Sequence, residues 1–355
     1  MRPIQANISS HALQHNLKVV RKHAANAKVM AVIKANGYGH GLMPVAHALN
    51  QADAFATLNL SEAIELREAG FTHPILLLEG VFSSEELRIA AGFEIDVVVH
   101  HTHQINMLQT TDLMRPVHVH LKMNSGMNRL GFPCKDYATA YQHLSSCPQV
   151  GEITLMTHFA TADTAAGIQQ PLARFSEATK TLDAPISLAN SATILRHPAA
   201  HADWVRPGIM LYGASPVTDT PAIDFDLKPA MQLHSQIIAV QTLNKGDGVG
   251  YGAQFIAQQT MRIGVVACGY ADGYPRHAPN GTLIAVDGQF SKTLGRVSMD
   301  MLCCDLSDLP DADIGSKVEL WGNLVPVDTV AEASGTIGYE LLCAIAPRVP
   351  MKVVD

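Results

Sequence analysis

The sequence has little charge and no long apolar run. Charged residues make up 16% of its 355 positions and hydrophobic residues 47%, a balance that favours large buried cores and a buried subunit interface. The net charge is −7 and no basic stripe occurs, which argues against nucleic acid as a partner. No apolar stretch reaches the roughly 18 residues that a membrane span needs. The first ten residues lack the apolar core of a signal peptide, so we expect a cytoplasmic protein.

The chain also lacks the common cysteine motifs. No two of its six cysteines form a C-x-x-C pair, and no zinc-ribbon spacing occurs. Two histidine pairs, His11 with His15 and His118 with His120, are spaced as metal ligands can be, but neither has an obvious carboxylate or cysteine to complete a ligand set. We therefore expect reduced structural thiols and no metal.

The first 227 residues alternate between short apolar runs and helical segments. A strand-like stretch comes first, and Ser9 or Ser10 can cap the helix that follows it. Eight apolar runs then lie at 29–33, 54–58, 75–78, 95–99, 116–121, 153–157, 186–189 and 204–211, with helical patterns between them that include 61–69, 85–91, 136–146 and 168–182. Eight strands that alternate with helices are typical of a parallel barrel, so we predict an α/β protein with an N-terminal (β/α)8 barrel of the TIM type.

The pattern changes beyond residue 227. Strand-like runs such as LHSQIIAVQTL and MRIGVVACGY are separated by turn sequences such as KGDG and APNG. Helical pattern returns only near 328–333 and 338–345. We predict a mostly β C-terminal domain over 228–355 and a barrel domain over 1–227, joined near 225–229.

The stretch VMAVIKANGYGHG at 29–41 carries the strongest chemical signal. Lys34 follows an apolar strand, where partial desolvation disfavours the charged ammonium form. A neutral amine is nucleophilic and can form a Schiff base with an aldehyde. The glycines beyond it let backbone N–H groups approach an anion such as a phosphate. The pattern suits a lysine that holds pyridoxal phosphate, although a solvated lysine before a glycine turn is the commoner meaning of such a pattern alone.

Further polar residues follow other strands of the predicted barrel. His158 ends the sixth strand, Ser191 follows the seventh, and Arg206 lies on the eighth. Because the reacting groups of parallel barrels sit at the carboxyl ends of the strands, these residues should share one face with Lys34. The sequence therefore places a polar site there without reference to any relative.

The segment VIKANGYGHG resembles the cofactor-attachment motif of the alanine racemases. Further segments resemble other motifs of that family and occur in its order, namely MNSGMNRLGF, THFATAD, ANSA, VRPGIMLYG, GVGYGAQF, GYADGY, GRVSMDM and TIGYE. Together they extend from residue 29 to residue 340. The resemblance implies a pyridoxal 5'-phosphate-dependent isomerase that interconverts L-alanine and D-alanine, either to supply D-alanine for peptidoglycan or to catabolise it. It also implies that the first eight residues or so join the β domain.

The resemblance further implies roles for individual residues. Lys34 would carry the cofactor, with Arg206 facing its ring nitrogen and a phosphate site formed by Tyr38, Ser191, Gly208, Ile209 and Tyr339. Lys34 and Tyr251 would be the two catalytic bases on opposite faces of the substrate, with His158 and Arg206 linked to Tyr251. Arg129 and Met299 would bind the substrate carboxylate, supported by Lys122 and Asp300. Because Tyr251 and Met299 come from the other subunit in the family, the resemblance implies a homodimer with shared active sites.

Each of these residues also has an ordinary interpretation. Ser191 could be a plain helix cap, and Arg206 could form an ion pair inside the barrel. Tyr251 could be a turn aromatic between two glycines, and Lys122 could be a surface lysine, or one modified by carbamylation as in some family members.

Two other functions remain open. The first is a pyridoxal-phosphate-dependent decarboxylase of basic amino acids, which shares the two-domain layout. Against it, the C-terminal region lacks the cysteine–aspartate pair of those enzymes, and Arg206 stands where they carry a carboxylate. The second is a non-catalytic carrier of the cofactor built from a single barrel, which the additional β domain argues against.

Overall fold

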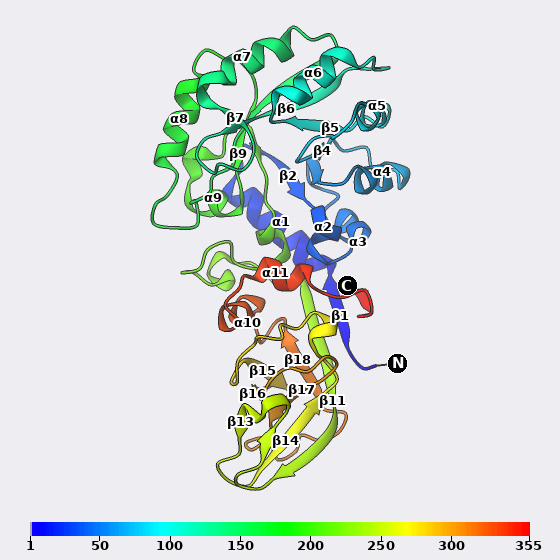
Figure 1. Ribbon diagram of the computed structural model, residues 1–355, viewed down its shortest axis with the longest axis vertical. Coiled ribbons are helices and arrows are strands. Elements are labelled where there is room, and N and C mark those ends of the chain that lie inside the picture. The colour runs from blue at the N-terminus through cyan, green and yellow to red at the C-terminus, as the bar shows by residue number, and fades with distance from the viewer. Residues whose placement is uncertain (1) are drawn as a thin grey trace.

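A closed ring of eight parallel strands forms the N-terminal part of the chain in the computed structural model, which describes residues 2–355 (Figure 1). In chain order the strands of the ring are β2 (Lys28–Val32), β3 (Ala54–Thr57), β4 (Ile75–Leu77), β5 (Asp96–Val99), β6 (Val117–Asn124), β8 (Val150–Met156), β9 (Ile186–Ala189) and β10 (Trp204–Val205). Each strand pairs in parallel with the next, and β10 closes the ring on β2. The predicted (β/α)8 barrel is confirmed.

Helices lie around the outside of the barrel (Figure 1). They are α1 (Ser10–His23), α3 (Leu42–Ala48), α4 (Leu60–Glu68), α5 (Ser84–Gly92), α6 (Thr102–Thr110), α7 (Cys134–Ser145), α8 (Gln169–Thr179) and α9 (Ser191–Arg196). The hydroxyl of Ser9 accepts the N–H of Ala12 and so caps α1, as the sequence predicts. The sequence did not predict the helices at 42–48 and 102–110.

The last barrel strand is much shorter than predicted. We expected a strand over 204–211, but β10 ends at Val205, and Ile209–Tyr212 forms a short 3-10 helix, η2. Pro207 has no N–H to donate to a neighbouring strand, so the ladder stops there. The apolar residues of η2 are fully buried, which explains why they looked like a strand in the sequence.

The C-terminal part is a sheet of eight strands below the barrel in Figure 1. Its strands are β1 (Gln5–Ser9), β11 (Met231–Leu243), β14 (Met261–Val266), β15 (Leu283–Val286), β16 (Gln289–Leu294), β17 (Leu302–Asp305), β18 (Lys317–Trp321) and β19 (Met351–Val354). β1 pairs with β11 and with β19, so the start of the chain belongs to this sheet. The mostly β C-terminal architecture is as predicted.

Short elements complete the structure. They are α2 (Lys34–Tyr38), α10 (Val327–Ala333), α11 (Gly338–Cys343), β7 (Phe132–Pro133), β12 (Gly248–Val249), β13 (Phe255–Ile256), η1 (Pro198–Ala200), η3 (Ala222–Phe225), η4 (Tyr251–Ala253) and η5 (Tyr270–Asp272). α11 packs against α2 where the barrel meets the sheet (Figure 1). A Cβ on Gly39 would lie only 2.1 Å from the carbonyl oxygen of Leu342, so this contact requires glycine. None of the helices within 2–355 is long and apolar enough to cross a membrane.

Candidate active site

Lys34 stands at the carboxyl end of β2, at the start of a left-handed turn. The four residues after it, 35–38, have φ values of 54°, 54°, 61° and 51°. Only Gly37 among them adopts such values at low cost. Left-handed backbone at a non-glycine residue costs about 1–3 kcal/mol and persists only where surrounding contacts enforce it. The turn that follows Lys34 is therefore strained and must be held by its neighbours.

Two residues that the sequence analysis did not single out hold this turn. The carboxylate of Glu62 accepts the N–H of Asn36 at 3.1 Å. Nδ1 of His40 lies 3.1 Å from the carbonyl oxygen of Gly37 and 2.9 Å from that of Tyr38. Burial lowers the pKa of His40 to about 4, so the ring is neutral and its Nδ1–H donates to these carbonyls. His40 belongs to the motif GYGHG, which was the one signal in the sequence for its role.

Replacing His40 by alanine should weaken cofactor binding by about tenfold, the worth of one lost hydrogen bond to the turn. The cofactor dissociation constant, measured by equilibrium dialysis, checks this. His40→Asn is the matched control, because its shorter amide can still donate to the turn and should lose less affinity. Equal affinities in the parent and both variants would show that the imidazole does not set the geometry of the turn.

Lys34 is a partly buried amine with no carboxylate bonded to it in the described chain. Burial lowers its pKa, and the nearby Arg129 guanidinium lowers it further, while Glu79 acts weakly in the opposite direction. A lower pKa leaves more of the amine neutral and nucleophilic at neutral pH. The interpretation of Lys34 as a freely solvated lysine does not agree with this environment.

A polar cradle lies beside Lys34. The Ser191 hydroxyl, buried at the start of α9, accepts the N–H of Gly208 at 2.9 Å. A Cβ on Gly208 would lie 2.6 Å from the phenol oxygen of Tyr38, so only glycine lets this backbone lie under the phenol. The Tyr38 ring stacks on the Tyr212 ring with their centroids 4.5 Å apart. The centroid of the Tyr339 ring, on α11, lies 6.1 Å from that of Tyr38. Hydroxyl and backbone N–H groups from four separate segments thus meet here, as an anion site requires.

Arg206 is buried inside the barrel, and its hydrogen bonds go to uncharged groups. It donates to the Ser187 hydroxyl at 2.6 Å and to the Thr157 carbonyl at 2.7 Å. Burial lowers its pKa to about 10, which still leaves it charged at neutral pH. No carboxylate within residues 2–355 forms an ion pair with it. The alternative interpretation of Arg206 as half of a barrel ion pair is therefore wrong.

His158 and Lys122 lie near Arg206 at the same face of the barrel. Burial and the charge of Arg206 lower the pKa of His158 to about 3, so its imidazole is neutral. The same two causes lower the pKa of Lys122 to about 8. Lys122 is only 8% exposed, so it is not a surface lysine. Within the described chain, Arg206 donates its hydrogen bonds to Ser187, Thr157 and Leu188, and none of them goes to His158. The link between these two residues is electrostatic.

The residues predicted to come from the other subunit belong to the C-terminal part of the fold, whereas Lys34 is at the end of a barrel strand. Tyr251 begins η4 in the β domain and is 71% exposed, and Met299 is 52% exposed. Asp300, next to Met299, forms an ion pair with Arg348 at 2.7 Å. The Arg2 side chain donates to the backbone carbonyl of Asp300 at 2.6 Å, which helps to fix this loop. Arg129 lies on the exposed loop after β6, in a small pocket with Lys122 and His158.

The site thus combines an amine of lowered pKa, an anion cradle and an unpaired arginine at the carboxyl ends of barrel strands, in a chain that carries a second, β domain. This set defines a barrel enzyme built to hold a phosphorylated aldehyde cofactor. Residues 8–216 match the family model "Alanine racemase, N-terminal domain", and residues 230–353 match "Alanine racemase, C-terminal domain". The chain belongs to the alanine racemase family.

Relatives in this family match over nearly the whole chain. The chain is 54% identical over 352 residues to an alanine racemase of Burkholderia mallei, covering 99% of each sequence. It is 53% identical to the catabolic alanine racemase of Klebsiella aerogenes, again over 99% of each. Its structure is similar to that of the biosynthetic alanine racemase from Pseudomonas aeruginosa, with a TM-score of 0.97, 46% identity and 100% of both chains covered.

Proposed function

We propose that this protein is a pyridoxal 5'-phosphate-dependent isomerase that interconverts L-alanine and D-alanine. The observation that carries the proposal is the Lys34 amine of lowered pKa beside the Tyr38–Ser191–Gly208 cradle, in a chain of the alanine racemase family. Polarimetry on the purified enzyme with each small L-amino acid in turn tests it. Optical rotation should fall to zero for alanine, and rotation that stays constant would contradict the proposal. Whether serine is also accepted follows from the same series.

The residues present fit this cofactor. Lys34 would hold its aldehyde, and Tyr38, Ser191, Gly208, Ile209 and Tyr339 would hold its phosphate. Arg206 would face its ring nitrogen, and because a guanidinium donates a hydrogen bond without giving up its proton, that nitrogen would stay unprotonated. When bound, the cofactor withdraws electrons from the α-carbon of the amino acid and so makes the α-proton removable.

The chain's own residues would then move the proton. Racemisation requires a base on each face of the α-carbon, and we assign Lys34 to one face and Tyr251 to the other. Arg129 and the backbone of Met299 would bind the substrate carboxylate and fix which faces the two bases reach. Lys122 would support Arg129, His158 would line the site as a neutral imidazole, and Asp300 would hold the Met299 loop.

We propose a homodimer in which each active site uses both subunits. The support is that Tyr251 and Met299 are exposed in the single chain. Of the two proposed bases, the barrel supplies Lys34, and Tyr251 belongs to the β domain. Exposed Met301 follows Met299 by two residues, and exposed Tyr270 lies beside this loop because its N–H donates to the Ser298 carbonyl at 3.0 Å. Both extend the apolar surface, as an interface of two copies would need.

Mixing Lys34→Ala protein with Tyr251→Phe protein should restore activity that neither has alone. Random re-association makes about half of the dimers mixed, and each mixed dimer contains one intact site. Activity should therefore return to about a quarter of the parental value. Native mass spectrometry confirms subunit exchange, and two copies of either single variant are the controls. Exchange without restored activity would contradict shared sites.

The alternative functions have less support. The relatives named above are alanine racemases. In addition, the position where the decarboxylases carry a carboxylate holds Arg206, which donates to Ser187 and Thr157. Release of carbon dioxide from ornithine, lysine or diaminopimelate would identify a decarboxylase instead. A carrier without catalysis would turn over no amino acid at all.

Three further assignments are proposals of the same kind. We divide the chain into a cofactor-binding barrel domain at 1–227, with its first eight residues in the β sheet, and a β domain at 228–355; the family matches end and begin near this boundary. We place the protein in the cytoplasm, because all six cysteines are free and a reducing compartment keeps them so. Its role is D-alanine supply for peptidoglycan or alanine catabolism, and a requirement of a deletion strain for D-alanine would identify the first.

A further inference from the structure

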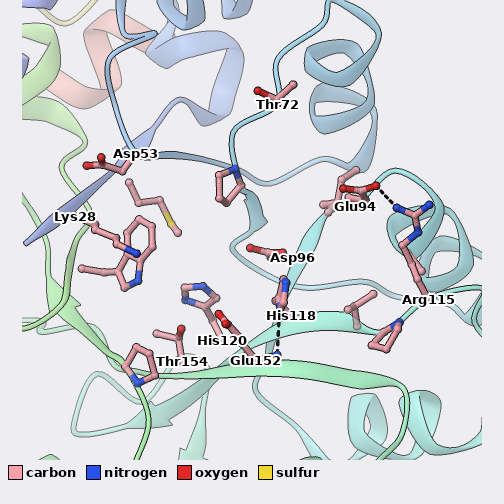
Figure 2. Close-up of a pocket in the computed structure, with 18 of the residues that line it drawn as sticks. Lys28, Asp53, Thr72, Glu94, Asp96, Arg115, His118, His120, Glu152 and Thr154 are labelled. Atoms are coloured by element: carbon pink, nitrogen blue, oxygen red, sulfur yellow. Dashed lines mark hydrogen bonds and ion pairs between the residues drawn. The ribbon is translucent and has the colours of Figure 1, made fainter.

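A cavity of about 700 Å³ lies at the opposite end of the barrel from Lys34. Figure 2 shows the side chains that line it. Its lining includes Lys28, Asp96, Val117 and Trp204, each the first residue of its strand. It therefore opens at the amino ends of the strands, whereas the candidate active site lies at their carboxyl ends. We call it the basal cavity. Its volume is in the range of sites that bind small molecules.

Two largely buried polar side chains that line the basal cavity have no hydrogen-bond or ion-pair partner within residues 2–355. Asp96 is 9% exposed, and within residues 2–355 its carboxylate makes no hydrogen bond or ion pair. Burial raises its pKa to about 6, while the nearby His118 and Arg67 act in the opposite direction. His120 is 5% exposed, and its Nδ1 has no hydrogen-bond partner among the residues that the structure describes. Buried polar groups are nearly always paired, so two in one cavity point to a ligand that pairs with them.

The charges of the basal cavity are nearly balanced, and several are already paired. Arg115 is bonded to Glu94, and Asp53 pairs with Arg21 at 3.2 Å. The donors of Arg67 are engaged by four backbone carbonyls. The groups that stay available are the carboxylates of Asp96 and Glu152 and the ammonium of Lys28. A ligand of high charge of either sign would meet repulsion from one of these sets.

The available groups of opposite charge lie on different sides of the cavity. Figure 2 shows the Asp96 carboxylate pointing into the cavity on one side, Lys28 on the other, and the His120 ring between them. The Lys28 ammonium lies 5.2 Å from the centre of the Trp204 ring, which helps to keep it at the wall. On the side of Asp96, His118 uses Nδ1 to accept the N–H of Glu152 at 2.9 Å. A molecule with a positive and a negative end would match both sides.

We propose that the basal cavity binds a small zwitterion of the amino-acid or dipeptide class, with its ammonium group at Asp96 and its carboxylate at Lys28. The middle of the ligand would lie over His120, whose neutral ring can hydrogen-bond to an amide. Lys28, Asp96 and His120 are not among the residues assigned to the candidate active site.

Calorimetric titration of the cofactor-loaded enzyme with glycylglycine tests the proposal. One molecule should bind per chain, and Lys28→Met and Asp96→Asn should each weaken binding by at least about tenfold, as expected for loss of a charge-assisted hydrogen bond. Arg129→Met, at the other end of the barrel, is the matched control and should bind as the parent does. Lys28 is exposed, so its variant should fold even if the Asp96 variant does not.

Two capped peptides decide the ligand class. Glycylglycinamide keeps only the positive end, and N-acetylglycylglycine keeps only the negative end, so both should bind more weakly than glycylglycine. Absence of binding at tens of millimolar glycylglycine would overturn the proposal, as would binding lost in Arg129→Met but kept in Lys28→Met. Equal binding of a capped peptide would show a site for a simple ion and would also overturn it.

Discussion

Replacing Lys34 by alanine should reduce racemisation by about 10⁴-fold or more, because the substitution removes both the cofactor anchor and one base, and loss of a general base alone costs about 10²–10⁴-fold. In the parent enzyme, borohydride should fix the cofactor to the peptide that contains Lys34. In Lys34→Ala it should fix none. Peptide mass spectrometry of the reduced, digested protein measures both outcomes.

Lys34→Arg is the matched control for this experiment. It keeps the positive charge at the end of β2 but has no primary amine, so it should be as inactive as Lys34→Ala and equally unlabelled. Lys122 is the informative competitor, because it is also buried and its pKa is lowered to about 8. Recovery of the label on the peptide that contains Lys122 would overturn the assignment of Lys34.

Replacing Tyr251 by phenylalanine should reduce racemisation by about 10²–10⁴-fold and leave exchange on one face of the substrate intact. Each base can reach only one face of the α-carbon. By resemblance to the family, Tyr251 faces the α-hydrogen of L-alanine and Lys34 faces that of D-alanine. In deuterated water, proton NMR should show D-alanine losing its α-proton signal much faster than it is converted to L-alanine, while L-alanine exchanges slowly.

Two outcomes would contradict this prediction in different ways. Rapid exchange of L-alanine with D-alanine left unchanged would reverse the assignment of the two faces. Racemisation at nearly the parental rate would show that Tyr251 is not a base. Tyr270→Phe, which removes the hydroxyl of another exposed tyrosine of the β domain, is the control and should exchange the α-protons of both enantiomers as the parent does.

The sequence by itself determined the architecture and the residues at the mouth of the barrel. Eight apolar runs alternate with helical segments, and this local pattern suffices for a closed parallel barrel, because buried strands and amphipathic helices have different periods. Lys34, His158, Ser191 and Arg206 all follow or lie on such runs. They meet at one face in the structure because parallel strands place all their carboxyl ends on the same side.

Tertiary structure decided what surrounds those residues. The left-handed turn after Lys34 depends on Glu62 and His40, and Lys122 is buried in a small pocket that the loop after β6 and His158 also line. The sequence also indicated a strand over 204–211, whereas the fold forms η2 there, since burial and strand formation give the same apolar pattern.

The basal cavity could not be predicted from the sequence either, because it depends on tertiary contacts. In the sequence, His118 and His120 indicate only a possible metal pair, and within residues 2–355 no group of at least three metal-binding side chains is present. What makes this pair notable is Asp96, which lies on the neighbouring strand, β5, and Lys28, which lies across the cavity on β2. Periodicity along a chain reports which side chains are buried. Which groups meet, and which charges stay without a partner, depends on contacts between strands that are far apart in the sequence.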